Sequence, residues 1–455
     1  MRSVLPNHTR PIWAEISASR LRDNFHALQT AAGPDVEVLA VVKADAYGHG
    51  ATECAPVLAG AGAQWLGVTS AEEGLAVRAS LAILPQGMSP RVLVMCGLWP
   101  GEEAGILERG LTSVVWEPYH LDLLEAEARR RNLPARSVAV HAEIDTGMAR
   151  QGVTPGDLLG RLLGRFTPDS PLKLEGVMTH LASTEVGDDP QNQVQMIAFA
   201  AALQQVAAAG LNPEYVHAGN TSSTDSGYIP HDLPALAATL GARAMTRAGL
   251  ALYGYALPLE SATNRVPHVY KGDAESLPEQ PQDRVPHVHE GDVGSVPDSR
   301  PTPAANQDFL NPHLAPNLKP TMTWKTRIVS LREVQCGDTI GYNGTFIAPA
   351  TMRLALLPVG YADGFRRGLS ASNAHAGGAV LLHGSRAPIV GRVSMDLTII
   401  DVTAIPECNI GDEAILLGDA NGERIGADEH ARLAGTSAYE ILCGISDRVP
   451  RIVVP

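Results

Sequence analysis

The chain has 455 residues, 45% hydrophobic and 18% charged, which is enough for two domains with sizeable buried cores. Its 35 basic and 49 acidic residues give a formal net charge of -14, which argues against a nucleic acid or an anionic membrane as partner. The first residues form no apolar signal segment, and no later stretch is long and apolar enough to span a membrane. The five scattered cysteines form no CxxC pair, so we expect a cytoplasmic protein with reduced thiols.

Short β-rich runs alternate with helix-like segments between about residues 35 and 255. In chain order they are VLAVVK (38–43), WLGVTS (65–70), RVLVMCG (91–97), LTSVVW (111–116), SVAVHAEIDTG (137–147), LEGVMTH (174–180), YVHAGN (215–220) and TRAGLALYG (246–254). The intervening helices carry apolar stripes at helical spacing, such as Leu21, Phe25 and Leu28. Eight strands that alternate with helices favour an α/β fold closed into a parallel (β/α)8 barrel over an open doubly wound sheet.

Residues 259–320 differ in composition, since they are rich in Pro, Asp, Glu, His and Asn and lack hydrophobic periodicity. Within them RVPHVYKGDAESLP (265–278) recurs as RVPHVHEGDVGSVP (284–297), but two copies are too few for a solenoid. The second copy holds four side chains of metal-binding types, namely His287, His289, Glu290 and Asp292. The first copy has Tyr270 and Lys271 at two of those places, so we predict a flexible, solvated linker and no metal site.

From about residue 321 the pattern becomes β throughout, with runs separated by Gly and Asn turns. The runs are WKTRIVSLREV, RLALLPVGY, AVLLHG, APIVGRVSMDLTIIDV and EAILLGD. A second, mainly antiparallel β domain therefore follows the barrel. We expect the barrel at residues 13–256, the linker at 259–320 and the β domain at 321–455.

The segment AVVKADAYGHG (40–50) carries the first chemical signal, because its apolar run ends abruptly at Lys43. A desolvated lysine amine forms Schiff bases with carbonyl compounds, including pyridoxal phosphate (PLP), whereas most lysines at strand ends are simply solvated. In a parallel barrel, chemistry gathers at the carboxyl ends of the strands. On this prediction several polar side chains converge on one mouth: Lys43, Asp145, His180, Asn220 and Arg247.

Further motifs follow in a fixed order along the chain. They are EIDTGMARQG (143–152), GVMTHLAS (176–183), HAGNTSS (217–223), TRAGLALYG (246–254), IGYNGTF (340–346), LPVGYADG (357–364) and GRVSMDLTIIDV (391–402). Together with the lysine segment, they resemble the alanine racemase family over residues 10–258 and 321–455. The resemblance implies PLP as cofactor, interconversion of L- and D-alanine, and supply of D-alanine for peptidoglycan. It also implies that residues 1–12 join the second domain, with PIWAEI at 11–16 beginning the crossover.

The same resemblance implies a role for each matching residue. Lys43 would hold PLP and serve as one base, and Tyr342 would be the opposed base, contributed to the partner's site in an obligate homodimer. The cofactor contacts would be Tyr47, His180, Asn220, Thr221, Arg247, Gly249 and Leu250. Arg150 and Met395 would bind substrate, and Tyr361 and Asp396 would line the site or its entrance.

Inverting an α-carbon requires a proton to leave one face and another to arrive on the opposite face, which two opposed bases do most simply. Tyrosine has a pKa near 10, so Tyr342 needs help, and we predict a chain from Tyr342 through His180 to Arg247. Because arginine stays protonated, Arg247 should keep the pyridine nitrogen facing it unprotonated and so disfavour side reactions.

Three positions depart from the commonest family pattern. Glu143 stands where many members have a carbamate-modified lysine, and its carboxylate could orient Arg150. Asp447 stands where some members have a tyrosine near the phosphate, and we expect it to point elsewhere. Thr221 replaces a frequent serine and keeps the hydroxyl.

Three other functions are alternatives to this one. A broad-specificity amino-acid racemase on the same fold stays open, although a pocket narrowed by Tyr342, Tyr361 and Met395 suits small apolar substrates. A non-catalytic PLP carrier would lack the β domain and its tyrosine. A barrel decarboxylase would carry an acidic or CxxC-flanked specificity loop, which is not evident here.

Overall fold

Eight parallel strands close the first half of the chain into a barrel, because β2 pairs with both β3 and β9. The strands are β2 (Val36–Val41), β3 (Trp65–Val68), β4 (Arg91–Val94), β5 (Thr112–Val115), β6 (Val138–Glu143), β7 (Leu172–Met178), β8 (Tyr215–His217) and β9 (Arg243–Ala248). The predicted (β/α)8 architecture is confirmed. The computed structural model describes residues 9–85, 87–186, 189–259, 314 and 317–455, so the duplicated segment and its histidines lie outside the described residues.

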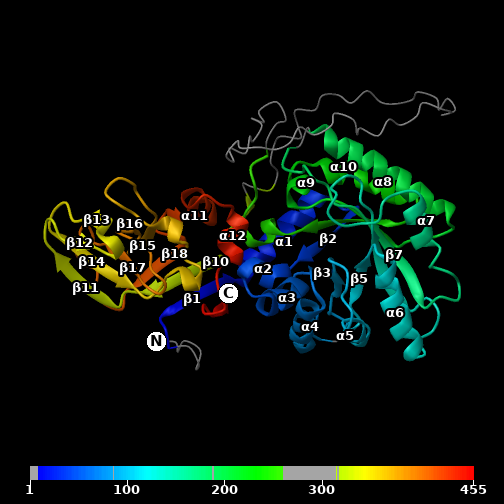
Figure 1. Ribbon diagram of the computed structural model, residues 1–455, viewed down its shortest axis with the longest axis horizontal. Coiled ribbons are helices and arrows are strands. Elements are labelled where there is room, and N and C mark those ends of the chain that lie inside the picture. Colours follow the sequence, from blue (N-terminus) through cyan, green and yellow to red (C-terminus); the bar gives the residue numbers. More distant parts are fainter. Residues whose placement is uncertain (1–8, 86, 187–188, 260–313, 315–316) are drawn as a thin grey trace, which may run out of the picture.

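Helices surround the barrel (Figure 1). They are α1 (Ala18–Ala32), α3 (Ala51–Gly60), α4 (Ala71–Ser80), α5 (Glu103–Arg109), α6 (Pro118–Arg130), α7 (Asp157–Leu163), α8 (Pro190–Ala208), α9 (Thr221–Asp225) and α10 (Tyr228–Ala238). α1 shows why such segments are helical: the Ser17 hydroxyl accepts from the Arg20 N–H at its start, and Leu21, Phe25 and Leu28 form its buried face. Along the described ranges, no helix combines the length and apolarity that a membrane crossing requires.

The second half of the chain forms mainly antiparallel sheets. Its strands are β10 (Met322–Arg327), β11 (Ser330–Val334), β12 (Thr339–Ile340), β13 (Phe346–Ile347), β14 (Met352–Leu357), β15 (Ala379–Leu382), β16 (Ser385–Pro388), β17 (Thr398–Asp401), β18 (Glu413–Ala420), β19 (Glu423–Ile425) and β20 (Arg451–Val454). The amino-terminal strand β1 (Ile12–Ser17) lies between β10, antiparallel to it, and β20, parallel to it. The start of the chain is therefore part of the carboxyl-terminal sheet.

Two helices of the second half, α11 (Ala427–Ala434) and α12 (Ala438–Cys443), lie between this sheet and the barrel (Figure 1). α12 packs on α2 (Lys43–Gly48): a β-carbon on Gly48 would stand 2.1 Å from the Leu442 carbonyl oxygen. The Arg451 Nε also donates to the Gly48 carbonyl at 3.0 Å. The second half of the chain therefore forms one wall of the barrel mouth.

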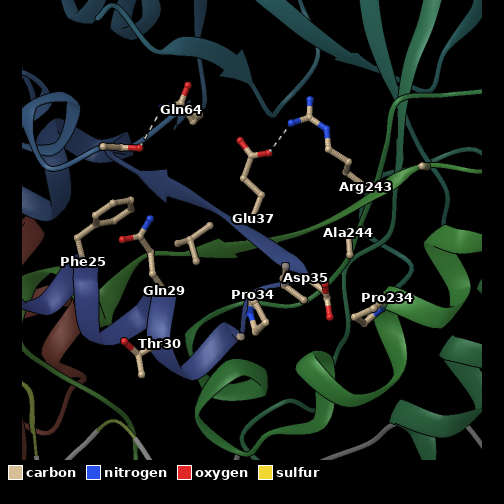
Figure 2. A pocket seen from close by; sticks show the side chains of 15 residues that line it. Phe25, Gln29, Thr30, Pro34, Asp35, Glu37, Gln64, Pro234, Arg243 and Ala244 are labelled. Carbon is tan, nitrogen blue, oxygen red and sulfur yellow. Dashed lines mark hydrogen bonds and ion pairs between the residues drawn. The ribbon is translucent and has the colours of Figure 1, made fainter.

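A cavity of about 990 Å³ lies at the opposite end, where β2 and β9 begin (Figure 2). Glu37 and Arg243 approach each other there with 3.3 Å between Oε2 and Nη1. The Arg243 guanidinium also lies 4.3 Å from the centre of the Tyr215 ring. These contacts tie the first and last barrel strands together at the foot, far from the strand ends that carry Lys43.

Candidate active site

Lys43 is carried by a left-handed turn. The four residues after it, Ala44 to Tyr47, have φ between 51° and 55°, a region that costs non-glycine residues about 1–2 kcal/mol each. Carboxylates hold the turn in place: Glu73 Oε1 accepts from the Ala44 N–H at 2.6 Å, and Asp45 Oδ1 accepts from the Ala51 N–H at 2.7 Å. The turn directs Lys43 into the mouth and buries Tyr47.

A pocket of about 190 Å³ at the barrel mouth gathers most of the predicted site residues. Those lining it are Lys43, Tyr47, Arg150, His180, Asn220, Thr221, Arg247, Gly249 and Leu250. Asp447 is exposed and is not among the lining residues. Asp145 is absent from the lining as well, and its Oδ1 instead accepts the backbone N–H groups of Gly147, Met148 and Ala149.

The remaining predicted residues lie elsewhere in the chain. Tyr342, Tyr361, Met395 and Asp396 line a separate hollow of about 780 Å³ on the second half, beside Arg392. The Tyr342 side chain is 67% exposed and Met395 is 53% exposed. The described chain therefore does not bring Tyr342 to Lys43.

Arg247 and His180 form the electrostatic centre of the pocket. The Arg247 Nη2 donates to the Thr179 carbonyl at 2.7 Å and to His180 Nδ1 at 3.1 Å. Burial lowers the pKa of Arg247 to about 10, so the guanidinium stays charged at neutral pH. Burial and the Arg247 charge lower the pKa of His180 to about 3. Because arginine only donates, His180 is a neutral imidazole that accepts at Nδ1 and carries its proton on Nε2.

Hydroxyl groups and a glycine form the other side of the pocket. The Thr221 Oγ1 accepts from the backbone N–H groups of Gly249 and Ala251, at 3.2 and 3.4 Å. A β-carbon on Gly249 would stand 2.2 Å from the Tyr47 Oη, so only glycine fits there. Burial raises the pKa of Tyr47 and keeps its phenol protonated. Closely approaching hydroxyl and amide groups suit a phosphate, so the residues present fit PLP.

Glu143 is held by a residue that the sequence did not single out. Glu143 is 2% exposed, and its carboxylate accepts from the Gln151 Nε2 at 2.5 Å, while the same Nε2 donates to the Met95 carbonyl at 3.1 Å. Burial raises the pKa of Glu143. Among the described residues, the direct hydrogen bond to the Glu143 carboxylate comes from Gln151, and the Arg150 side chain is exposed, so the orienting role of Glu143 toward Arg150 stays a prediction.

Tyr439 is a second pocket residue that the sequence did not indicate. It comes from α12 and lines the pocket, with its ring centre 5.9 Å from that of Tyr47. Burial raises its pKa to about 12. The segment SAYEIL contains no chemical motif, so only the packing of α12 against the barrel reveals this residue.

The fold and the pocket together define a class, that of barrel enzymes which hold a phosphate-bearing aldehyde cofactor on a lysine at the strand ends. Models of the alanine racemase N-terminal and C-terminal domains match residues 16–257 and 321–453, so the chain belongs to the alanine racemase family. As a member, it is a PLP-dependent enzyme that racemises alanine, and the broad-specificity and carrier alternatives are not favoured.

Individual relatives agree over nearly the whole chain. A curated alanine racemase from Symbiobacterium thermophilum is 34% identical over 444 residues, which cover 97% of each chain. The solved alanine racemase from Streptomyces coelicolor A3(2) superposes with a TM-score of 0.75 at 29% identity, over 98% of both chains. One from Bartonella henselae, solved with covalently bound pyridoxal phosphate, shares the fold with a TM-score of 0.69 at 23% identity, over 98% of this chain and 99% of that one.

Proposed function

We propose that Lys43 and the partner subunit's Tyr342 are the two opposed bases of this racemase, acting in a cytoplasmic homodimer that supplies D-alanine for peptidoglycan. One observation carries the proposal: the predicted residues divide between two hollows, with Lys43 in one and an exposed Tyr342 in the other. A surface that exposes Tyr342, Tyr361, Met395 and Leu397 is typical of an interface. A second copy of the chain would bring the two hollows together.

Each pocket residue has a part in holding PLP and substrate. Tyr47, Asn220, Thr221, Gly249 and Leu250 would hold the phosphate, and Arg247 would face the pyridine nitrogen. PLP bound at Lys43 supplies an electron sink that makes the α-proton of alanine acidic.

The substrate carboxylate would pair with Arg150, beside Met395 of the partner subunit. Tyr361 of the partner subunit and the partner's Asp396 would line the entrance.

The proposed domains are a barrel at 13–256 and a β domain at 321–455 joined by residues 1–12.

Proton transfer follows from the placement of these groups. The Lys43 Nζ would take or return the α-proton on one face of alanine, and the Oη of the partner's Tyr342 would do so on the other. A phenol with an ordinary pKa near 10 is a poor base at neutral pH. The neutral His180 imidazole would donate its Nε2–H to the phenolate oxygen and so stabilise it. Arg247 holds the ring in this orientation by donating to the other ring nitrogen, Nδ1.

Subunit complementation tests the division of the two bases. Lys43→Ala and Tyr342→Phe homodimers should each be inactive. Mixed dimers of the two variants should regain one intact site, so a random one-to-one mixture should reach about a quarter of wild-type activity.

The matched control mixes Lys43→Ala with the double variant Lys43→Ala, Tyr342→Phe, which leaves no intact site in any dimer. If the first mixture stays as inactive as this control, the two bases come from one subunit and the proposal is wrong.

A further inference from the structure

A chain of buried polar side chains runs through the barrel beneath the active site. The Arg247 Nη1 lies 3.3 Å from His217 Nδ1, and His217 Nε2 lies 2.9 Å from His141 Nδ1. His141 Nε2 lies 3.4 Å from Glu175 Oε2, and Glu175 makes a close ion pair with Arg91. Both histidines are fully buried, whereas the Arg91 side chain is 40% exposed. The chain of contacts thus links the mouth of the barrel to the amino end of β4.

The hydrogen bonds of this chain have only one consistent direction. Arginine can only donate, so His217 Nδ1 accepts from Arg247 and the His217 proton must sit on Nε2. That proton is donated to His141 Nδ1, which puts the His141 proton on Nε2, where it reaches the Glu175 carboxylate. Burial lowers the pKa of both histidines, so each is a neutral imidazole with one donor and one acceptor. The donor at one end, Arg247, and the acceptor at the other, Glu175, therefore require the same pair of tautomers.

Glu175 is suited to that place because it stays ionised. Burial alone would raise the pKa of its carboxyl, but hydrogen bonds from His141 and Arg91 lower it to about 2. Arg91 in turn lies over the Trp65 ring, 4.2 Å from the centre, which fixes the guanidinium.

The backbone is shaped around His141. The pairing of β6 with β7 shifts register between Val140 and His141, and such irregularities re-aim a side chain. A β-carbon on Gly176 would stand 2.5 Å from His141 Nδ1, so the ring occupies space that only a glycine leaves. These two features hold the imidazole between its partners.

We propose that Glu175, acting through His141 and His217, is a positioning residue that sets the orientation and hydrogen bonding of Arg247. This inference rests on the proposed function in taking Arg247 as the group that faces the cofactor. Without the carboxylate, Arg247 alone would favour these tautomers, and the His141 N–H would be buried without its acceptor. If both histidines changed tautomer to avoid that cost, His217 would present an N–H to the Arg247 N–H. That clash would displace the guanidinium from the pocket.

The barrel foot supplies a matched control. Glu37 also pairs with an arginine there, Arg243, but no hydrogen bond of the described residues joins it to a histidine. If Glu175 only fastened the foot of the barrel, Glu175→Leu and Glu37→Leu would have the same effect. Glu175→Gln keeps an oxygen that accepts from His141 and is the conservative variant.

The test combines histidine tautomers with kinetics, using the holoenzyme. Long-range ¹H–¹⁵N spectra of ¹⁵N-histidine-labelled wild-type protein should show His141 and His217 protonated on Nε2. Glu175→Leu should lose that signature for His217, lower kcat about tenfold or more with a smaller change in KM, and shift the pH dependence of the bound-PLP absorption. Glu175→Gln should restore most of kcat, and Glu37→Leu should leave kcat and the absorption unchanged.

Two results would overturn the inference: Nδ1 protonation of His217 in the wild type, which needs no variant to fold, or equal kinetics in Glu175→Leu and Glu37→Leu. A protein that does not racemise alanine, yet has the predicted tautomers and loses them in Glu175→Leu, would refute the proposed function while supporting the role of Glu175.

Discussion

Single residues store strain next to the reactive lysine. Ala44, Asp45, Ala46 and Tyr47 all have left-handed φ, and none is glycine. A short right-handed helix would be cheaper for these residues, so tertiary contacts maintain the turn, notably Glu73 on the Ala44 N–H and the burial of Tyr47. The strained turn lowers the stability of the chain, but it places the Lys43 side chain in the pocket.

Replacing Ala44 by glycine should relieve part of this strain. The Ala44 side chain is exposed, so its loss removes no packing, and we expect Ala44→Gly to stabilise the protein by up to about 1 kcal/mol. Ala201, exposed in the right-handed helix α8, is the control: Ala201→Gly should destabilise by about 1 kcal/mol. Urea unfolding at one protein concentration measures both, and equal losses in the two variants would contradict the strained turn.

The order of motifs predicted which residues would line the mouth, since Lys43, His180 and Asn220 each follow a barrel strand and Arg247 lies near the end of β9. The left-handed turn was beyond prediction, because ADAY contains none of the residues that favour positive φ without penalty. Gln151 and Glu175 were missed for a related reason: their importance comes from partners distant in the sequence.

At the scale of elements, the contact between α2 and α12 joins the second half of the chain to the active site. Gly48 in α2 has φ of 79° and lies against the Leu442 carbonyl, while Tyr439 on the same α12 lines the pocket. The position of the lysine-bearing turn therefore depends on a helix about 400 residues further along the chain.

Enlarging Gly48 should separate these two elements. In Gly48→Ala the new β-carbon would meet the Leu442 backbone, so α12 must move, and we expect lower stability together with weaker PLP binding. Gly62→Ala is the control, because Gly62 has φ of 99° but open space around it, and its cost should be only the backbone term of about 1–2 kcal/mol. Titration of the apoprotein with PLP measures the affinity of each variant. Equal PLP affinities in Gly48→Ala and Gly62→Ala would contradict a role for the contact between α2 and α12.

Elements themselves were largely predictable. Short apolar runs such as WLGV indicated strands, and the stripe of α1 indicated a helix, because both patterns are local properties of the sequence. The register shift at His141 and the packing of α12 are not local, so no pattern in either segment indicated them.

At the scale of the whole molecule, one chain holds the two groups of predicted site residues apart. The pocket with Lys43 contains a charged Arg247 and a neutral His180, whereas the hollow with Tyr342 is exposed on the other half of the chain. The sequence predicted this division only through family resemblance, since nothing in the segment IGYNGTF indicates whether Tyr342 acts in its own subunit or in the partner subunit. A dimer in which each barrel receives the other subunit's tyrosine accounts for both hollows at once.

The most direct test follows the α-proton and the handedness of alanine together. Purified holoenzyme is incubated with L-alanine in deuterated water, and the products are separated by chirality and analysed for α-deuterium. The account predicts that D-alanine appears carrying deuterium, because the group that protonates the second face exchanges its proton with the solvent. The mixture should end with equal amounts of the two isomers, because enantiomers have equal free energies. Deuterium exchange into L-alanine without any D-alanine would contradict it, since proton transfer would then occur on one face alone and Tyr342 would not be the second base.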